Sequence, residues 1–541
     1  MTVLSDLVRE PAHNEPGLPA GFCAEYPGYG RTAVLDELRA SEYAYVDTGG
    51  HVYLDYTGAG LPAQAQLAAH VARVSGGCFG NPHSENPTSA ASTELVERAR
   101  RSVLAHFNAP PEEYAVIFTP NASGACRLVG EAYPFGPRTR FVLTHDNHNS
   151  VTGIREFARA RGSVTEYVPF TSPDLRVGDE AVHAALGRAR PGYPRAPWRA
   201  IRSGVAPWAG RGPRARRQRS LSKAWVQDER RSVAGPAGGR PTRRRGLFAY
   251  PAQSNFTGVQ HPLRWIEAAH EHGYDVLLDA AAYVPSNRLD LAEIKPDFVP
   301  VSWYKVFGYP TGVGCLIARR QALARLWRPW FAGGTIYAAS ARGDWHVLAG
   351  DEARFEDGTP SFLHVPDLEF GLSWITGIGI DLIHTRVTCL TGWLLGRLGA
   401  LRHTNGTPMV RIYGPADTRE RGGTVAFNLL DPVGRLVDER AVARDTAAAG
   451  ISVRTGCFCN PGASEGAFEL SSASVMRPLR RGVRTLDEYL DATGLQSGGA
   501  VRASVGLASN VGDVERLLTF LETAYRDRPA DAGGLAPRLR C

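Results

Sequence analysis

A lysine that follows a short apolar strand is the residue on which the chemistry of this chain centres. Residues 298–301 are apolar and predict a buried strand ending at Ser302, and Lys305 comes directly after it. Ligands bind beyond the carboxyl ends of the strands in open α/β sheets. Apolar neighbours desolvate an ammonium group there and lower its pKa, as a Schiff-base lysine requires. A partly buried lysine whose ammonium reaches water is the structural alternative.

The pair Ser302-x-x-Lys305 also matches the serine nucleophile motif of β-lactamases. Those enzymes need Lys-Thr-Gly and Ser-Asp-Asn triplets as well, and the chain contains neither. The lysine must therefore be interpreted through its other neighbours.

Three more features with chemical potential lie where predicted strands end. Residues 119–125 place backbone N–H groups at a helix start, which suits a phosphate, although the same pattern also makes a simple helix cap. His148 can stack on a flat ring, or it can be structural. Asp279 closes an apolar strand, and a buried carboxylate needs a cationic partner such as a protonated pyridine nitrogen. Together with Lys305, these are the parts of a pyridoxal 5′-phosphate (PLP) site.

The composition is that of a globular protein with a large core. The chain has 541 residues, of which 43% are hydrophobic and 21% charged. The length allows three or four domains, or two in a large α/β enzyme. No apolar stretch reaches the roughly 18 residues of a membrane-spanning helix, and residues 1–17 lack the features of a signal peptide. Eight cysteines are few for this length, so we expect a cytoplasmic protein without a membrane partner.

The net charge of +7 raises the question of nucleic-acid binding. The charge is concentrated in residues 188–245, where 16 Arg and one Lys face one Asp and one Glu, a net of +15, so the rest of the chain is net negative. This Arg/Gly/Pro-rich composition favours a disordered loop. A basic nucleic-acid arm and a translated reading-frame error are the alternatives, and we do not expect nucleic acid as the partner.

Strands and helices alternate through most of the chain, which predicts a parallel sheet with crossover helices. A strand at 314–318 would return antiparallel to the lysine strand. The sequence pattern changes near residue 335, after which we expect a long helical stretch over 367–398 and a polar loop that follows a strand at 451–454. We expect an N-terminal arm (1–48), a large cofactor-binding domain (49–334), a smaller domain (335–525) and a tail (526–541).

Several motifs resemble those of class V aminotransferase-fold enzymes. These are NHNS (147–150), DAAA (279–282), SWYK (302–305) and RTGCFCNPG (454–462). Within that group the chain is most similar to the PLP domain of molybdenum cofactor sulfurases, relatives of cysteine desulfurases. Residues 80–84, 251–255 and 305–312 support this closer assignment, and the resemblance covers residues 53–525 apart from the basic segment.

The resemblance implies an α/β fold of PLP fold type I, with a mainly parallel seven-stranded sheet, a smaller α+β C-terminal domain and a homodimer. It implies that Lys305 carries PLP, His148 stacks on it and takes part in catalysis, and Asp279 pairs with its nitrogen. The remaining cofactor contacts would come from Ala122, Ser123, Ala281, Ser302 and Thr335, the last from a dimer partner.

The resemblance also implies a substrate site and a reaction. Arg502 would bind the substrate carboxylate with help from Asn255 and Arg454, and Cys459 would be the nucleophile. Arg454 is five residues before Cys459 and could favour its thiolate. The activity would convert L-cysteine to L-alanine and leave a persulfide on Cys459, for transfer to molybdenum cofactor, a molybdoenzyme or another acceptor.

The chain departs from the pattern in two places. Many cysteine desulfurases have Gln at the position of Ala282, and the chain ends soon after the PLP domain, which leaves the acceptor open. The basic segment falls where the family has a helix and a strand, so damage to the core sheet is possible. The chain has no second cysteine pair to complete a metal site with CFC (457–459), so no metal is expected.

Three other functions stay open. The first is a class V PLP enzyme that does not use Cys459, such as a lyase, an epimerase or an aminotransferase. The second is an inactive PLP-fold protein, and the third is a nucleic-acid binder acting through the basic segment.

Overall fold

The computed structural model describes residues 18–82, 84–189, 244–350, 352–495, 497–531 and 535. The interpretations of the basic segment as a disordered loop, a nucleic-acid arm or a frame error concern residues that lie almost entirely outside this part of the chain. Among the described helices, none is long and apolar enough to cross a membrane.

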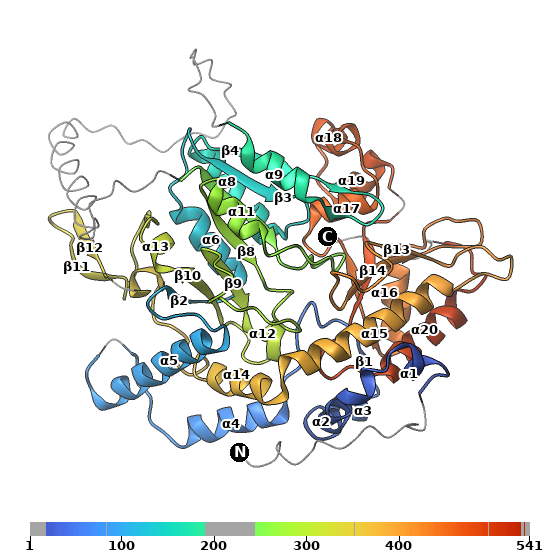
Figure 1. Ribbon diagram of the computed structural model, residues 1–541, viewed down its shortest axis with the longest axis horizontal. Coiled ribbons are helices and arrows are strands. Elements are labelled where there is room, and N and C mark those ends of the chain that lie inside the picture. Colours follow the sequence, from blue (N-terminus) through green and yellow to red (C-terminus); the bar gives the residue numbers. More distant parts are fainter. Residues whose placement is uncertain are drawn as a thin grey trace.

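A seven-stranded sheet forms the centre of the molecule (Figure 1). Its order is β2-β10-β9-β8-β7-β3-β4. All neighbouring strands are parallel except β10, which runs antiparallel to both β2 and β9. The mainly parallel seven-stranded sheet and its antiparallel return near residue 314 are thus confirmed. The strands are β2 (Tyr114–Thr119), β3 (Arg140–Thr144), β4 (Val164–Val168), β7 (Gly246–Pro251), β8 (Tyr274–Asp279), β9 (Phe298–Ser302) and β10 (Gly314–Arg319).

The sheet is continuous across the basic segment. β3 pairs in parallel with β7, from Arg140 opposite Gly246 to Leu143 opposite Ala249. The damaged core that the sequence left open is therefore not what the structure shows: β7, which follows the segment, pairs with β3, and β3 pairs with β4, the last strand of this sheet before the segment.

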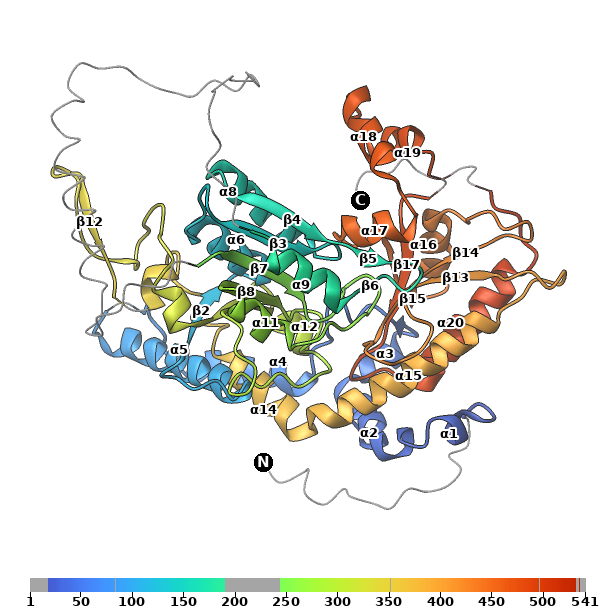
Figure 2. The ribbon, with the colours of Figure 1, turned by 45° about the horizontal axis from the view of Figure 1, so that its top comes forward.

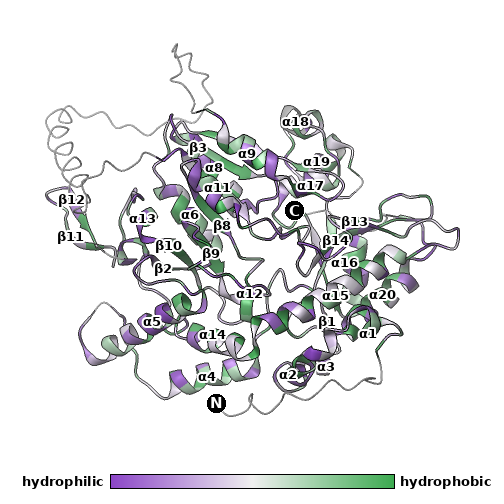
Figure 3. Ribbon diagram, viewed as in Figure 1, coloured by the Kyte–Doolittle hydropathy of each residue, from purple (hydrophilic) through white to green (hydrophobic). Residues whose placement is uncertain are grey.

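Alternate residues of the strands face two separate cores. On β2, Val116 belongs to one cluster of buried side chains and Ile117 to the other. Because both faces are covered, the inner strands are mostly apolar, and Figure 3 draws much of the sheet in green. Helices α6 (Ala122–Ala132) and α8 (Ile154–Ala160) pack in the second cluster. Helices with residues in the first cluster include α5 (Pro87–His106), α9 (Asp179–Gly187), α11 (Trp265–Glu271) and α14 (Asp367–Ile378).

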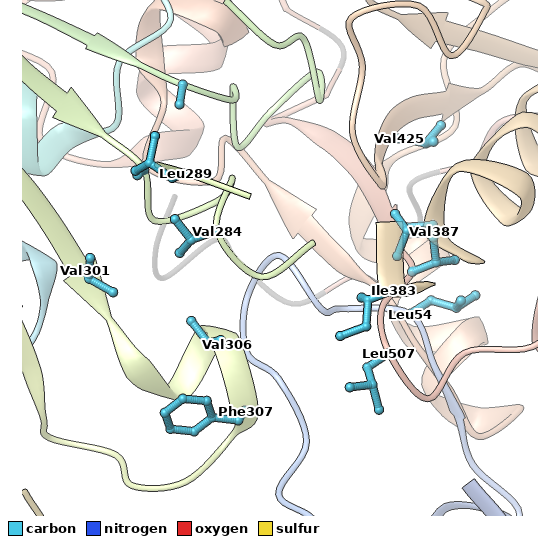
Figure 4. Close-up of a cluster of buried hydrophobic side chains, with 14 of the residues drawn as sticks. Leu54, Val284, Leu289, Val301, Val306, Phe307, Ile383, Val387, Val425 and Leu507 are labelled. Atoms are coloured by element: carbon cyan, nitrogen blue, oxygen red, sulfur yellow. The ribbon is translucent and has the colours of Figure 1, made fainter. Parts of the chain in front are cut away.

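A four-stranded antiparallel sheet in the order β13-β14-β17-β16 lies on the other side of the molecule (Figure 2). The two sheets share one core, since side chains beside the first sheet, such as Phe307, belong to the same cluster as Val425 and Leu507 from the second part (Figure 4). The elements here are β13 (Val410–Tyr413), β14 (Thr424–Leu429), β16 (Arg454–Gly456), β17 (Ala500–Ser504), α15 (Ile380–Ala400), α16 (Glu439–Ala448) and α20 (Val511–Tyr525).

Two details differ from the sequence interpretation. The helix expected over 367–398 is divided into α14 and α15 at Gly379, whose φ of 93° favours glycine. The polar loop expected after residue 454 contains three helices, α17 (Pro461–Ala467), α18 (Ser472–Arg481) and α19 (Leu486–Thr493).

The N-terminal segment joins the C-terminal part of the molecule. β1 (Val52–Tyr53) pairs in parallel with β15 (Ile451–Ser452). The other described elements are α1 (Phe22–Glu25), α2 (Val34–Glu42), α3 (Ala44–Thr48), α4 (Gln64–Ser75), α7 (Asn149–Thr152), α12 (Trp303–Phe307), α13 (Arg320–Leu323), the hairpins β5 (Phe170–Thr171)–β6 (Arg176–Val177) and β11 (Ile336–Ser340)–β12 (Trp345–Leu348), and two 3₁₀ turns (Tyr29–Thr32 and Glu352–Phe355).

Candidate active site

The predicted site residues of the large sheet follow the carboxyl ends of its parallel strands. Ala122 follows β2, His148 follows β3, Asn255 follows β7, Asp279 ends β8 and Lys305 follows β9. Because these strands share one direction, their carboxyl ends lie along one edge of the sheet, where open α/β sheets bind ligands.

Lys305 lies on the short helix α12, which Gly308 ends with a φ of 75°. Burial is the main cause that lowers the pKa of this amine, the charge of Arg502 lowers it further, and the carboxylate of Asp279 opposes the change. A lysine whose amine is more readily deprotonated is suited to bonding with an aldehyde.

His148 caps helix α7. Its Nδ1 accepts a hydrogen bond from the backbone N–H of Ser150 at 3.1 Å and lies 3.0 Å from Ser150 Oγ. Because Nδ1 is an acceptor, the proton of the neutral ring is on Nε2. Burial lowers the pKa of His148, and the nearby charge of Lys305 lowers it further. The neutral imidazole can therefore stack on a flat ring and can exchange a proton at Nε2.

Asp279 accepts a hydrogen bond, but it has no cationic partner among the described residues. Its Oδ1 accepts the backbone N–H of Ala281 at 3.1 Å. Among the described residues, no arginine, lysine or histidine lies within ion-pair distance of its carboxylate. A protonated pyridine nitrogen would supply that missing partner.

The start of helix α6 has the features of an anion-binding site. Asn121 caps the helix through a 3.0 Å bond from Gly124 N–H, and Ala122 N–H donates to Ser302 Oγ at 2.8 Å. Ser123 Oγ lies 2.6 Å from Ser150 Oγ. Hydroxyl groups from two other elements thus meet at a helix N-terminus, an arrangement that suits a phosphate group. With the lysine, the unpaired carboxylate and the neutral histidine, these residues fit PLP.

Arg502 is positioned on strand β17, and its side chain is only 3% exposed. Its Nη1 donates to the backbone oxygen of Asn255 at 3.0 Å, and its Nη2 donates to Asp55 Oδ1 at 2.8 Å. The guanidinium lies 4.8 Å from the ring centroid of Phe458. Asn255 also donates its side-chain N–H to Phe458 O at 2.8 Å. Two of the three predicted substrate residues, Arg502 and Asn255, are therefore in direct contact with each other and with the loop that carries Cys459.

The position of Arg454, five residues before Cys459, suggested that it acts on the Cys459 thiol, but its partner in the structure is Asp55. Its Nη2 lies 2.6 Å from Asp55 Oδ2, so the guanidinium binds Asp55, and no hydrogen bond links it to Cys459 among the described residues. Asp55, which pairs with both Arg454 and Arg502, is a candidate site residue that was not predicted from the sequence. Its signal was a charged residue directly after the apolar strand that begins at residue 52.

Cys459 is exposed in a loop held from several sides. The carbonyl of Cys459 accepts the N–H of Asn149 at 2.7 Å, and Asn460 donates to Asn255 Oδ1 at 2.9 Å. Phe458 and Cys459 have positive φ values of 53° and 54°, a conformation that costs free energy for residues other than glycine. The structure thus holds the backbone of Cys459 beside Asn149, the residue that follows His148, and leaves the cysteine exposed.

The last two predicted cofactor residues differ in position, since Thr335 lies apart from the site and Ala281 lies beside Lys305. Thr335 is buried, and its hydroxyl donates to Ala332 O at 2.7 Å within its own turn, so one chain does not bring it to Lys305. Ala281 lines a cavity of about 40 Å³ that Lys305 also lines. Thr57, Gln253 and Thr424 supply polar groups to its wall.

The Aminotransferase class-V family model matches residues 52–180 and 241–517 of this chain. Molybdenum cofactor sulfurase from Bos taurus is 35% identical over 516 residues, which are 91% of this chain and 52% of the relative. The chain therefore spans about half the length of this curated relative.

Solved structures show the same fold. An apo cysteine desulfurase from Thermococcus onnurineus NA1 has a TM-score of 0.66 and 20% identity, covering 90% of this chain and 97% of its own. A variant of C-DES, a cystine C–S lyase, with glycine covalently linked to its PLP cofactor, has a TM-score of 0.60 and 17% identity, covering 90% of this chain and 98% of its own.

Proposed function

Because the chain belongs to the class V aminotransferase family, we propose that it is a PLP-dependent sulfurtransferase of the cysteine desulfurase type. The observation that carries this proposal is the contact between two parts of the site. The loop of Cys459 is bonded to Asn149, the neighbour of His148, while Phe458 covers Arg502. A thiol, a buried arginine and a PLP-type constellation thus meet in one place.

Each residue has a role in holding the cofactor. Lys305 would bond to the aldehyde, Asp279 would pair with the ring nitrogen, and His148 would stack on the ring as a neutral imidazole. Ala122, Ser123 and Ser302 would hold the phosphate, and Ala281 would lie beside the ring. When bound, PLP acts as an electron sink that labilises the Cα proton of an amino acid.

The substrate would be L-cysteine. Arg502 and Asn255 would orient its carboxylate, and Lys305 would move protons at Cα. The Cys459 thiolate would attack the substrate sulfur, so that the C–S bond breaks and an S–S bond forms. The electron pair of the broken bond and the hydrogen of the substrate thiol end on Cβ, which gives L-alanine and a Cys459 persulfide.

The acceptor of the persulfide sulfur is proposed from the relatives. Similarity to molybdenum cofactor sulfurases supports molybdenum cofactor, or a molybdoenzyme that carries it, as the acceptor. The sparse cysteines support a cytoplasmic location.

We also propose a homodimer and the domain division given above. Exposed aromatic side chains gather in one segment, including Trp330, Tyr337 and Trp345, and an apolar surface of this kind indicates an interface. Thr335 lies in the same segment, so a partner subunit could bring it to the phosphate. The separate seven-stranded and four-stranded sheets support the division near residue 335.

The test is alanine formation from L-cysteine by the purified, PLP-loaded protein. We expect one alanine per sulfur released in the presence of a thiol acceptor, and loss of turnover in Cys459→Ser. If Cys459→Ser releases sulfide at the wild-type rate, the protein is a lyase. If the protein carries no visible absorption band of lysine-bound PLP, the enzyme interpretation fails.

A further inference from the structure

Two arginines face each other in the smaller sheet. Strands β16 and β17 are antiparallel, and their register places Arg454 directly opposite Arg502. Like charges directly opposite each other destabilise an antiparallel pair. The effect is strong here because the Arg502 side chain is almost fully buried and water screens its charge poorly.

Asp55 lies between the two guanidinium groups. Its Oδ1 is 2.8 Å from Arg502 Nη2, and its Oδ2 is 2.6 Å from Arg454 Nη2 and 3.0 Å from Arg454 Nε. Within the described part of the chain, no other carboxylate forms an ion pair with either arginine. The adjoining turn fits this group closely, because a Cβ on Gly58 would lie 2.5 Å from Asp55 Oδ2 and 2.7 Å from Arg454 Nη2.

We propose that Asp55 is a positioning residue for Arg502: it offsets the charge of Arg454 and fixes the direction of the buried guanidinium. This inference rests on the proposed function, in which Arg502 binds the substrate carboxylate. One carboxylate and two arginines leave one net positive charge, which matches a ligand with a single carboxylate. Arg502 Nε has no hydrogen-bond partner among the described residues, so the guanidinium keeps a donor for that ligand.

The proposal predicts which ligands Asp55 affects. In Asp55→Asn, Arg502 loses its charged anchor and faces Arg454 without compensation. The dissociation constant of L-alanine, measured by the change in the visible PLP spectrum, should rise at least tenfold. That of ethylamine, which has an amine but no carboxylate, should change less than twofold. Unchanged binding of L-alanine, or equal weakening of both ligands, would overturn the proposal.

A double variant separates positioning from general damage. Asp55→Asn/Arg454→Gln removes the excess charge, and its dissociation constant for L-alanine should return to within about threefold of the wild-type value. A double variant no better than the single one would contradict the proposal. Asp417→Asn is the matched control, since Asp417 pairs with exposed Arg419 at 2.7 Å.

The melting temperatures of the same variants give a readout that does not depend on PLP. The melting temperature should fall further in Asp55→Asn than in Asp417→Asn and should recover in the double variant. If the wild type carries no PLP while this pattern is found, the proposed function fails but the role of Asp55 toward Arg502 stands. If Asp55→Asn melts like the control, the role of Asp55 is refuted whatever the activity.

Discussion

The guanidinium of Arg502 lies 4.8 Å from the ring centroid of Phe458, the residue directly before Cys459. The arginine proposed to bind the substrate carboxylate is thus covered by the loop that carries the nucleophile. We expect a carboxylate that binds Arg502 to displace this ring, which would couple substrate binding to movement of the Cys459 loop.

This contact predicts tighter ligand binding when the ring is removed. A cation–π contact contributes roughly 0.5–2 kcal/mol, so Phe458→Leu should lower the dissociation constant of L-alanine by roughly 2- to 30-fold. Spectral titration of the PLP-loaded protein measures it. Phe468→Leu is the control, because Phe468 packs on Tyr413. Weaker binding in Phe458→Leu would show that the ring supports the arginine site and does not compete with the ligand.

Gly462 fixes the helix that follows the nucleophile. A Cβ at this position would collide with the carbonyl of His145, so Gly462→Ala must displace the start of α17. Because a shift of about 1 Å can cost 10²-fold in rate, persulfide formation should fall at least tenfold, while the PLP spectrum and L-alanine binding remain. Gly396→Ala serves for comparison, since no atom lies within 4 Å of its added Cβ. Full persulfide formation in Gly462→Ala would contradict this role of the loop.

Thr335 can be tested by mixing inactive subunits. If a partner subunit supplies Thr335, Lys305→Ala and Thr335→Ala should each be impaired alone. When subunits of the two variants exchange, each mixed dimer should have one intact site, made by Lys305 of one subunit and Thr335 of the other. The mixture should then regain up to about a quarter of the wild-type activity per subunit. Absence of recovery, with exchange verified by differently tagged chains, would place Thr335 outside the site.

Burial gives His106 a stability effect that depends on pH. Burial lowers its pKa from 6.5 to about 4, so below pH 6.5 the unfolded chain binds a proton that the folded protein does not. Stability should therefore fall as the pH falls from 6.5 to 4, by on the order of 3 kcal/mol at most, and this contribution should be constant below pH 4. Urea unfolding of the wild type and His106→Gln measures it, and the variant should lose less stability over that range. Exposed His51→Gln is the control, and parallel pH profiles for the wild type and His106→Gln would refute the assignment.

The sheet could be predicted because its strands are apolar on both faces and end in polar residues. The same endings located Asp279 and Lys305, because a charged residue after a buried strand is conspicuous. The two-part helix at Gly379 could not be predicted, since the apolar pattern continues through both halves. The helices after Cys459 were missed because their segments are short and polar.

The role of Asp55 could not be predicted from local sequence. It depends on the register that places Arg454 opposite Arg502 and on the pairing of β1 with β15, which brings Asp55 next to Arg454 although the two residues are 399 apart in the sequence. The pairing of Arg454 with Asp55 depends on the same long-range contacts.

The most direct test of the account is to locate the sulfur after a single turnover. PLP-loaded protein is mixed with a stoichiometric amount of L-cysteine, alkylated and digested, and the peptide containing Cys459 is weighed by mass spectrometry. Desulfuration through Cys459 predicts one additional sulfur on Cys459, with an equal amount of alanine, and neither in Lys305→Ala. Alanine or pyruvate formed while Cys459 stays unmodified would contradict it.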